Sequence, residues 1–156
     1  MTDAIYHTEY GTNLPTTYPH LKILVDALTD GLEIPVLAYA NVEQVSIQNA
    51  PSVFLIPEDV QVLETLKSVR TITSFRMKQE WLLLTVLRDA SDQSVTAPLI
   101  TQLGEWQARI LRILMTKVLV VGGPIQILDC PKSESIAGGA IAGKIRLTTQ
   151  FVFNAE

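Results

Sequence analysis

Residues 138–144, which read GGAIAGK, contain the residue types of a phosphate-binding loop. In such loops the backbone N–H groups hold the phosphates, the lysine neutralises charge, and a serine or threonine after the lysine binds Mg²⁺. Ile145 follows the lysine, and the residues beyond it alternate as in a strand. Neither the hydroxyl nor the helix N-terminus that a phosphate site needs is therefore expected. We predict a flexible loop that leads into the last strand.

Few residues are suited to nucleophilic or metal chemistry. The chain has one cysteine, Cys130, and two histidines, His7 and His20, which are distant in sequence. A nucleophilic site would require folding to bring a histidine to the nucleophile, and these residues give no spaced set of metal ligands. Glu58 and Asp59 are an adjacent acid pair, which is more typical of a turn or a helix start. We predict no catalytic, cofactor or metal site; an enzyme or ligand-binding domain around Glu58, Asp59 and His20 is the alternative.

The composition indicates apolar surface to bury beyond a single core. Charged residues make up 18% of the 156-residue chain, below the roughly 25% typical of soluble domains, and hydrophobic residues make up 47%. Subunit interfaces bury such surface, so we expect a homo-oligomer; an uncharged polar surface is the alternative. The apolar runs are far shorter than the roughly 20 residues of a membrane-spanning helix, and no secretory signal is apparent. We therefore expect no membrane partner and synthesis in the cytoplasm.

Charge is unevenly spread along the chain. Residues 1–64 hold nine acids and one base, Lys22, whereas the other 92 residues hold seven acids and eleven bases, for a net charge of −4. No basic cluster is dense enough to follow a phosphate backbone, so sequence-specific nucleic-acid binding is not expected. Even mixing of the charges is the simplest outcome of folding. If the charges separate instead, opposite patches suit a head-to-tail ring.

The hydrophobic pattern predicts an α+β fold in the order α-β-β-β-α-β-β-β. Residues 1–17 form an extended arm, and residues 18–156 a single domain whose mostly antiparallel sheet carries two main helices. The first helix should begin near Pro19 and end at Gly31. The expected strands are 51–56, 68–77, 81–87, 117–121, 125–128 and 145–153. We expect one or two helical turns over 58–66, a turn near Lys78 and Gln79, a hairpin turn at Gly122 and Gly123, and a long loop over 130–143.

The second helix, which begins near Pro98, has an apolar face and a polar face. Trp81 in the third strand and Trp106 in this helix occupy core positions, while Glu105 and Arg109 are spaced for an i, i+4 pair. Gly104 costs about 1 kcal/mol relative to alanine, which either close packing of another backbone or simple tolerance would explain. We expect the polar face and the glycine-rich loop to contact partners, through Glu105, Arg109, Arg112, Gly138, Gly139 and Lys144.

Several segments, taken in order, resemble one known family. They are the amphipathic first helix, APSVFLIP at 50–57, WLLLTVLR at 81–88, the helix over 99–115, and the last strand ending QFVF at 150–153. Together they are similar to the tail terminator, or tail completion, proteins of long-tailed bacteriophages. The resemblance covers most of the chain from about residue 18 onward. It lies in the order of the elements and in the general character of their sequences.

This resemblance implies a structural virion protein without enzymatic activity or a cofactor. Members of the family form a hexameric ring that caps the tail tube, stops its elongation and provides the surface for head joining. The implied partners are further copies of the chain, the tail tube protein and a neck or head–tail connector protein, and a ring lumen would pass DNA. The implied location is the head-proximal end of the virion tail. Another tail or neck component, such as a tube or head–tail joining protein, is the alternative.

Overall fold

The structure, a computed structural model, describes residues 18–40, 51–67, 72–88, 97–118, 125–136 and 139–154. It confirms the α+β class and, broadly, the predicted order of elements. The expected arm over 1–17 and the turn at Gly122 and Gly123 lie outside these residues. The elements are α2 (Leu21–Leu32), β1 (Val36–Ala38), β2 (Ser52–Lys67), β3 (Ile72–Arg88), α3 (Ala97–Thr116), β4 (Gln126–Asp129), β5 (Glu134–Ile136) and β6 (Ala140–Asn154).

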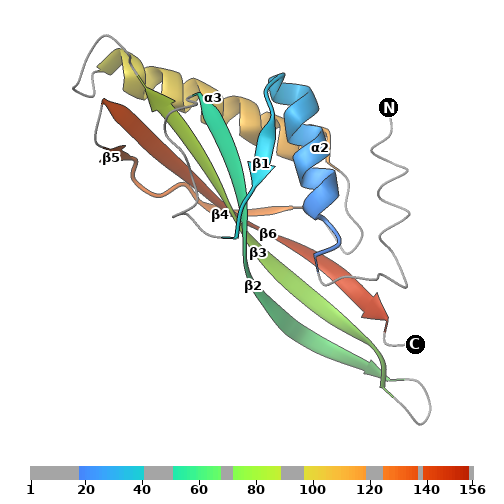
Figure 1. Cartoon of the computed structure of the whole chain (residues 1–156). Helices are drawn as coiled ribbons and strands as arrows, with labels where there is room; N and C mark the ends of the chain where they lie inside the picture. Colours follow the sequence, from blue (N-terminus) through green and yellow to red (C-terminus); the bar gives the residue numbers. More distant parts are fainter. Residues whose placement is uncertain are drawn as a thin grey trace.

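The strands form one mixed sheet in the order β1-β2-β3-β6-β4, with β5 pairing with another part of β6. β1 runs parallel to β2, and the other pairs are antiparallel. Both α2 and α3 lie on one face of the sheet, as Figure 1 shows. The main core lies between these helices and the sheet; its buried members on the strands include Val53, Leu55, Leu83, Ile145 and Leu147.

Helix α2 ends at Leu32, one residue later than the sequence indicates. Leu24, Leu28 and Leu32 are buried along one face, and Glu33, at φ 60°, is the left-handed residue that ends the helix. The expectation that Gly31 stops the helix was wrong. A Cβ built on Gly31 would lie 2.6 Å from Ile113 Cδ1, so this glycine lets α2 approach α3 closely.

The hairpin of β2 and β3 is much longer than expected. β2 continues through Pro57 to Lys67, so the helical turns expected over 58–66 are wrong, as is the turn near Lys78 and Gln79. The register shifts between Pro57 and Val60, where Gln79 Nε2 donates hydrogen bonds to the carbonyl oxygens of Glu58 (2.8 Å) and Glu80 (2.6 Å). These bonds support the strand where its proline and two acids interrupt regular pairing.

Strand β6 and helix α3 complete the core. β6 lies between β3 and the short strands β4 and β5, and it begins at Ala140. Half of the loop expected over 130–143 is therefore β5 and the start of β6. Helix α3 buries its predicted apolar face, although Trp106 is only half-buried. α3 ends at Thr116, so the strand expected from Lys117 does not begin there.

Beyond the helices, three strands extend as a ribbon: 58–67 of β2, 72–79 of β3 and 149–154 of β6. Figure 1 shows this ribbon projecting from the part of the sheet that α2 and α3 cover. His20, at the start of α2, is fully buried and packs edge-on against Phe151, with ring centroids 5.8 Å apart. The ribbon is therefore tied to the helical layer near its base.

Candidate functional site

The glycine-rich segment begins a strand. Gly139, at φ 77°, precedes β6, and Ala140, Ile141 and Ala142 are buried. Lys144 pairs with Leu84 on the face of the sheet opposite α3, and its Nζ lies 3.7 Å from Glu134 Oε1. No helix N-terminus follows the lysine, so this segment lacks the geometry of a phosphate-binding loop. Gly138 lies outside the described residues.

Gly143 serves packing between α3 and the sheet. A Cβ built there would lie 2.6 Å from Gln107 Nε2 and 2.9 Å from Leu103 Cδ1. A side chain there would force Leu103 and Gln107, or α3 itself, to shift. At Gly104, by contrast, a built Cβ would meet no atom within 4 Å. The close packing that would explain a glycine in the middle of α3 does not occur in the described part of the chain.

These two glycines should respond oppositely to substitution. Gly143→Val should lower the free energy of unfolding by about 2 kcal/mol because the added branches collide with Leu103 and Gln107. Gly104→Ala should raise it by about 1 kcal/mol through helix propensity alone. Urea denaturation at a protein concentration that keeps the chain monomeric measures both values. A neutral Gly143→Val would show that α3 does not pack closely on β6.

The polar residues of α3 make different contacts. Arg109 donates hydrogen bonds to the carbonyl oxygens of Gly31 (3.4 Å) and Leu32 (3.5 Å), at the C-terminal end of α2, and its guanidinium lies 5.1 Å from the centre of the Trp106 ring. A cation is favourable at a helix C-terminus. Arg109 thus joins α3 to α2, and no ion pair with Glu105 is among the described contacts. Glu105 and Arg112 are exposed.

The structure therefore divides the six predicted contact residues. Glu105, Arg109 and Arg112 lie on α3, which packs on the helix side of the sheet, whereas Lys144 lies on the opposite face. Gly139 forms the turn before β6. These residues do not form one surface. Glu105, Arg109 and Arg112 are all exposed on α3, and Arg109 also contacts the end of α2.

The candidates for catalysis lie in settings that suit other roles. His20 is in the core, and burial lowers its pKa to about 4. Glu58 and Asp59 are exposed where the β2 register shifts. Desolvation, followed by repulsion from Asp129, raises the pKa of the Cys130 thiol, which reduces its reactive thiolate form. The described residues contain no group of three or more histidine, cysteine or acidic side chains that could hold a metal ion.

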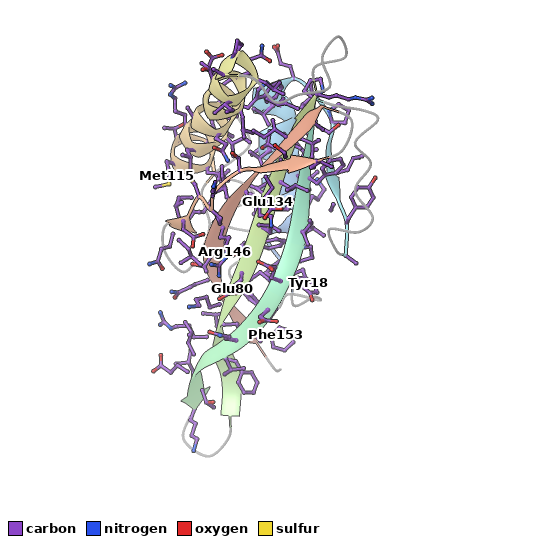
Figure 2. The ribbon with its side chains drawn as sticks, turned by 90° about the vertical axis from the view of Figure 1, so that its left-hand side faces the viewer. Tyr18, Glu80, Met115, Glu134, Arg146 and Phe153 are labelled. Carbon is purple, nitrogen blue, oxygen red and sulfur yellow. The ribbon has the colours of Figure 1, made fainter. Side chains whose placement is uncertain are left out.

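Helix α3 carries a second apolar face that the sequence analysis missed. We call it the outer stripe; its members are Ile100, Gly104, Ala108, Leu111 and Met115. Leu111 is partly buried and also packs against the main core. Ile100 is 51% exposed and Met115 is 55% exposed. Figure 2 shows Met115 projecting from α3 away from the sheet. The steps of three and four residues between these positions place them on one side of a helix, and this spacing was the signal in the sequence that could have identified them.

A second exposed apolar feature lies on the outer side of β2. Val62 is 56% exposed and Leu63 is 44% exposed. The exposed acids Glu58 and Asp59 precede them, and Glu64 beside them forms an ion pair with Arg76 of β3. Among the described residues, β1 pairs only with the start of β2, and no strand pairs with the outer side of β2 around Val62. We call this the β2 edge. Register shifts and charges are common ways to protect such an edge from uncontrolled pairing.

The charge asymmetry of the sequence persists among the described residues. The described residues of α2, β1, β2 and their connections, 18–40 and 51–67, hold six acids and two bases. The remaining described residues hold nine bases and four acids. β1 and β2 form one side of the sheet, while β6, β4 and β5 form the other, as Figure 1 shows. The acidic excess therefore lies on the α2, β1 and β2 part, whereas the basic excess comes mainly from β3 and α3. The side formed by β6, β4 and β5 is nearly neutral, and Lys144 and Arg146 there are paired with acids.

No helix in the described part of the chain is long and apolar enough to cross a membrane. The chain matches no protein-family model and no curated protein.

Proposed function

We propose that this chain is a structural virion protein, a tail terminator whose ring caps the tail tube, stops its elongation and provides the surface for head joining. The observation that supports this proposal most is the layer of two helices, α2 and α3, on one face of a mixed sheet. A tube subunit is expected to be more uniformly β. The proposal rests on this architecture together with the sequence resemblance described above.

The exposed surfaces agree with a protein that works by contact. The outer stripe and the β2 edge both expose large apolar side chains. The projecting ribbon is a further element to which a neighbouring protein can bind without disturbing the core. A ring on a tube needs such surfaces both for its neighbours and for the tube.

Electron microscopy of tail tubes assembled with and without the purified protein tests this function. A terminator should bind one end of each tube as a ring, and tubes should stop lengthening when the protein is added during assembly. Serum albumin at the same concentration is the negative control. A protein that stays monomeric and does not bind tubes contradicts the proposal.

The same images separate the nearest alternatives. A tube component would be incorporated along the whole length of the tube, whereas a terminator would be found only at an end. A head–tail joining protein would bind the neck end of completed tails without affecting the length of growing tubes. Tube length distributions, with and without the protein, therefore distinguish the three roles.

A further inference from the structure

The projecting ribbon continues the apolar face of the sheet that the helices cover. Trp81 and Leu83 of β3 belong to the core beneath the helices, and alternate residues of a strand share a face. Met77 and Phe75 therefore lie on the same side as this core, and so do the residues that pair with them on the neighbouring strands. We call this set the ribbon face; its members are Val62, Phe75, Met77, Phe151 and Phe153.

The opposite side of the ribbon is mostly polar, since the residues that alternate with the ribbon face in β3 are Ser74, Arg76 and Lys78. Such alternation is typical of an antiparallel sheet whose apolar side is covered. Figure 1 shows α2 and α3 over the other part of the sheet. At the base of the ribbon face Phe151 is fully buried, whereas Val62 is 56% exposed. The described helices therefore cover the base of this face and leave the rest of it to another segment.

The N-terminal part of the chain is attached at the base of the ribbon face. Tyr18 is the first described residue, and His20 packs edge-on against Phe151, with ring centroids 5.8 Å apart. Residues 1–17 precede this point, and an extended chain of that length reaches about 55 Å. The part of β3 over 72–79 spans about 25 Å. The segment 1–17 is thus long enough to reach every part of the ribbon face from its own point of attachment.

The segment 1–17 also has the side chains that such a face requires. It contains Ile5, Tyr6, Tyr10 and Leu14, and a tyrosine can bury its ring while its hydroxyl stays in water. A segment that is attached beside a surface meets it at an effective concentration of about a millimolar. A second copy at micromolar concentration meets the same surface far less often. The chain's own segment is therefore favoured over a separate molecule.

We propose that residues 1–17 bind the ribbon face of the same chain and cover its apolar side chains. The base of the ribbon is tied to α2 by the His20–Phe151 contact, and the N-terminal segment extends this cover toward the tip. The inference requires neither self-association nor the proposed function. A segment from a second copy is the other occupant, and the first experiment below distinguishes the two.

Photo-cross-linking of the whole 156-residue chain tests the contact directly. The photoreactive residue p-benzoylphenylalanine replaces Tyr10, and mass spectrometry identifies the residues that it joins. We expect most cross-links to fall within 72–79 and 149–154. The same photoreactive residue in place of the exposed Gln102 on α3 is the control and should not reach these segments. In an equal mixture of ¹⁵N-labelled and unlabelled chains, each cross-link should join residues of one label, because the contact lies within one molecule.

Cleavage after Glu9 by a glutamate-specific protease gives a second measurement. Met77→Lys places a charge in the centre of the ribbon face, so it should release the segment and raise the cleavage rate about tenfold. Phe153→Lys, near the end of β6, is a second variant of the face and should act in the same direction. Ser74→Lys adds the same group to the polar side of β3 and is the matched control, which should leave the rate unchanged. Circular dichroism checks that each variant is folded.

Other outcomes overturn the inference. Cross-links that fall mainly on α3 would place the segment elsewhere, and cross-links between chains of different label would assign the ribbon face to a second copy. A cleavage rate that Met77→Lys and Phe153→Lys leave unchanged, or that Ser74→Lys raises equally, would exclude the ribbon face. Wild-type cleavage as fast as that of a synthetic peptide of residues 1–17 would show that the segment is not bound. Tube capping, scored separately by electron microscopy, decides the proposed function whatever these results are.

Discussion

Replacing Trp81 with alanine should lower the free energy of unfolding by about 4 kcal/mol, the largest loss we expect from a single substitution. The side chain is fully buried at the centre of β3, and its Nε1–H donates a hydrogen bond of 2.9 Å to Thr149 Oγ1 on β6. The alanine variant would lose the packed ring and leave a cavity between the sheet and the helices. It would also leave the buried Thr149 hydroxyl without its donor.

Chemical denaturation at a fixed protein concentration measures this loss, and two variants divide it into parts. Trp81→Phe keeps an aromatic ring but removes the indole N–H, so we expect a loss of about 1–2 kcal/mol. Thr149→Val removes the acceptor and should cost a similar amount. If Trp81→Phe were as damaging as Trp81→Ala, the hydrogen bond rather than ring packing would dominate. If Trp81→Phe and Trp81→Ala both left the free energy of unfolding unchanged, Trp81 would not lie in the core.

The place of Trp81 shows what the sequence can predict here. The hydrophobic pattern predicted strands over 68–77 and 81–87, which the structure joins in β3, and it gave Trp81 a core position. The same pattern misplaced the hairpin, because Lys78 and Gln79 were interpreted as a polar turn. Gln79 is in fact fully buried. Its burial is tolerated because the side-chain Nε2 donates hydrogen bonds to the carbonyl oxygens of Glu58 and Glu80. A buried polar residue with such partners cannot be told from a turn residue without knowing the neighbouring strand.

Glycine positions were harder to predict for a similar reason. Gly31 follows the last apolar turn of α2 and fits a helix stop, yet the left-handed residue is Glu33. The actual requirement at Gly31 is the approach of Ile113, some eighty residues later in the chain. Gly143 likewise serves the approach of α3. Where two distant segments pack closely, the only sign of it in the sequence is a glycine. Rules that consider only neighbouring residues interpret such a glycine as a turn or a helix stop.

The candidate surface was predictable only in part. The sequence correctly placed exposed polar residues on α3, but it gave Arg109 the same role as Glu105 and Arg112. Arg109 instead stabilises the end of α2, and this depends on the crossing of two helices. The outer stripe was present in the spacing from Ile100 to Met115. Its exposure followed only from the structure, because the spacing of a buried stripe and an exposed stripe is the same.

The stability of the base of the ribbon should depend on pH through His20. Burial lowers the pKa of this histidine from 6.5 to about 4, and the ring packs against Phe151 on β6. The unfolded chain therefore binds a proton between about pH 6.5 and pH 4 that the folded chain does not. The contribution of His20 to the free energy of unfolding is fully present above this range and is lost as the pH falls through it. From about pH 7.5 to about pH 5 the loss should be about 2 kcal/mol.

Urea denaturation at several pH values, with the wild type and His20→Leu compared, measures this loss. His20→Leu should remove the His20 contribution and flatten the profile by about 2 kcal/mol over this range, whatever its effect at neutral pH. His7→Gln, which changes the other histidine of the sequence, is measured alongside and gives the contribution of that residue to the profile. Equal slopes in the wild type and His20→Leu would show that His20 is not buried in its neutral form. The ribbon would then not be tied to α2 through the His20–Phe151 contact, and its position relative to the helices would need another cause.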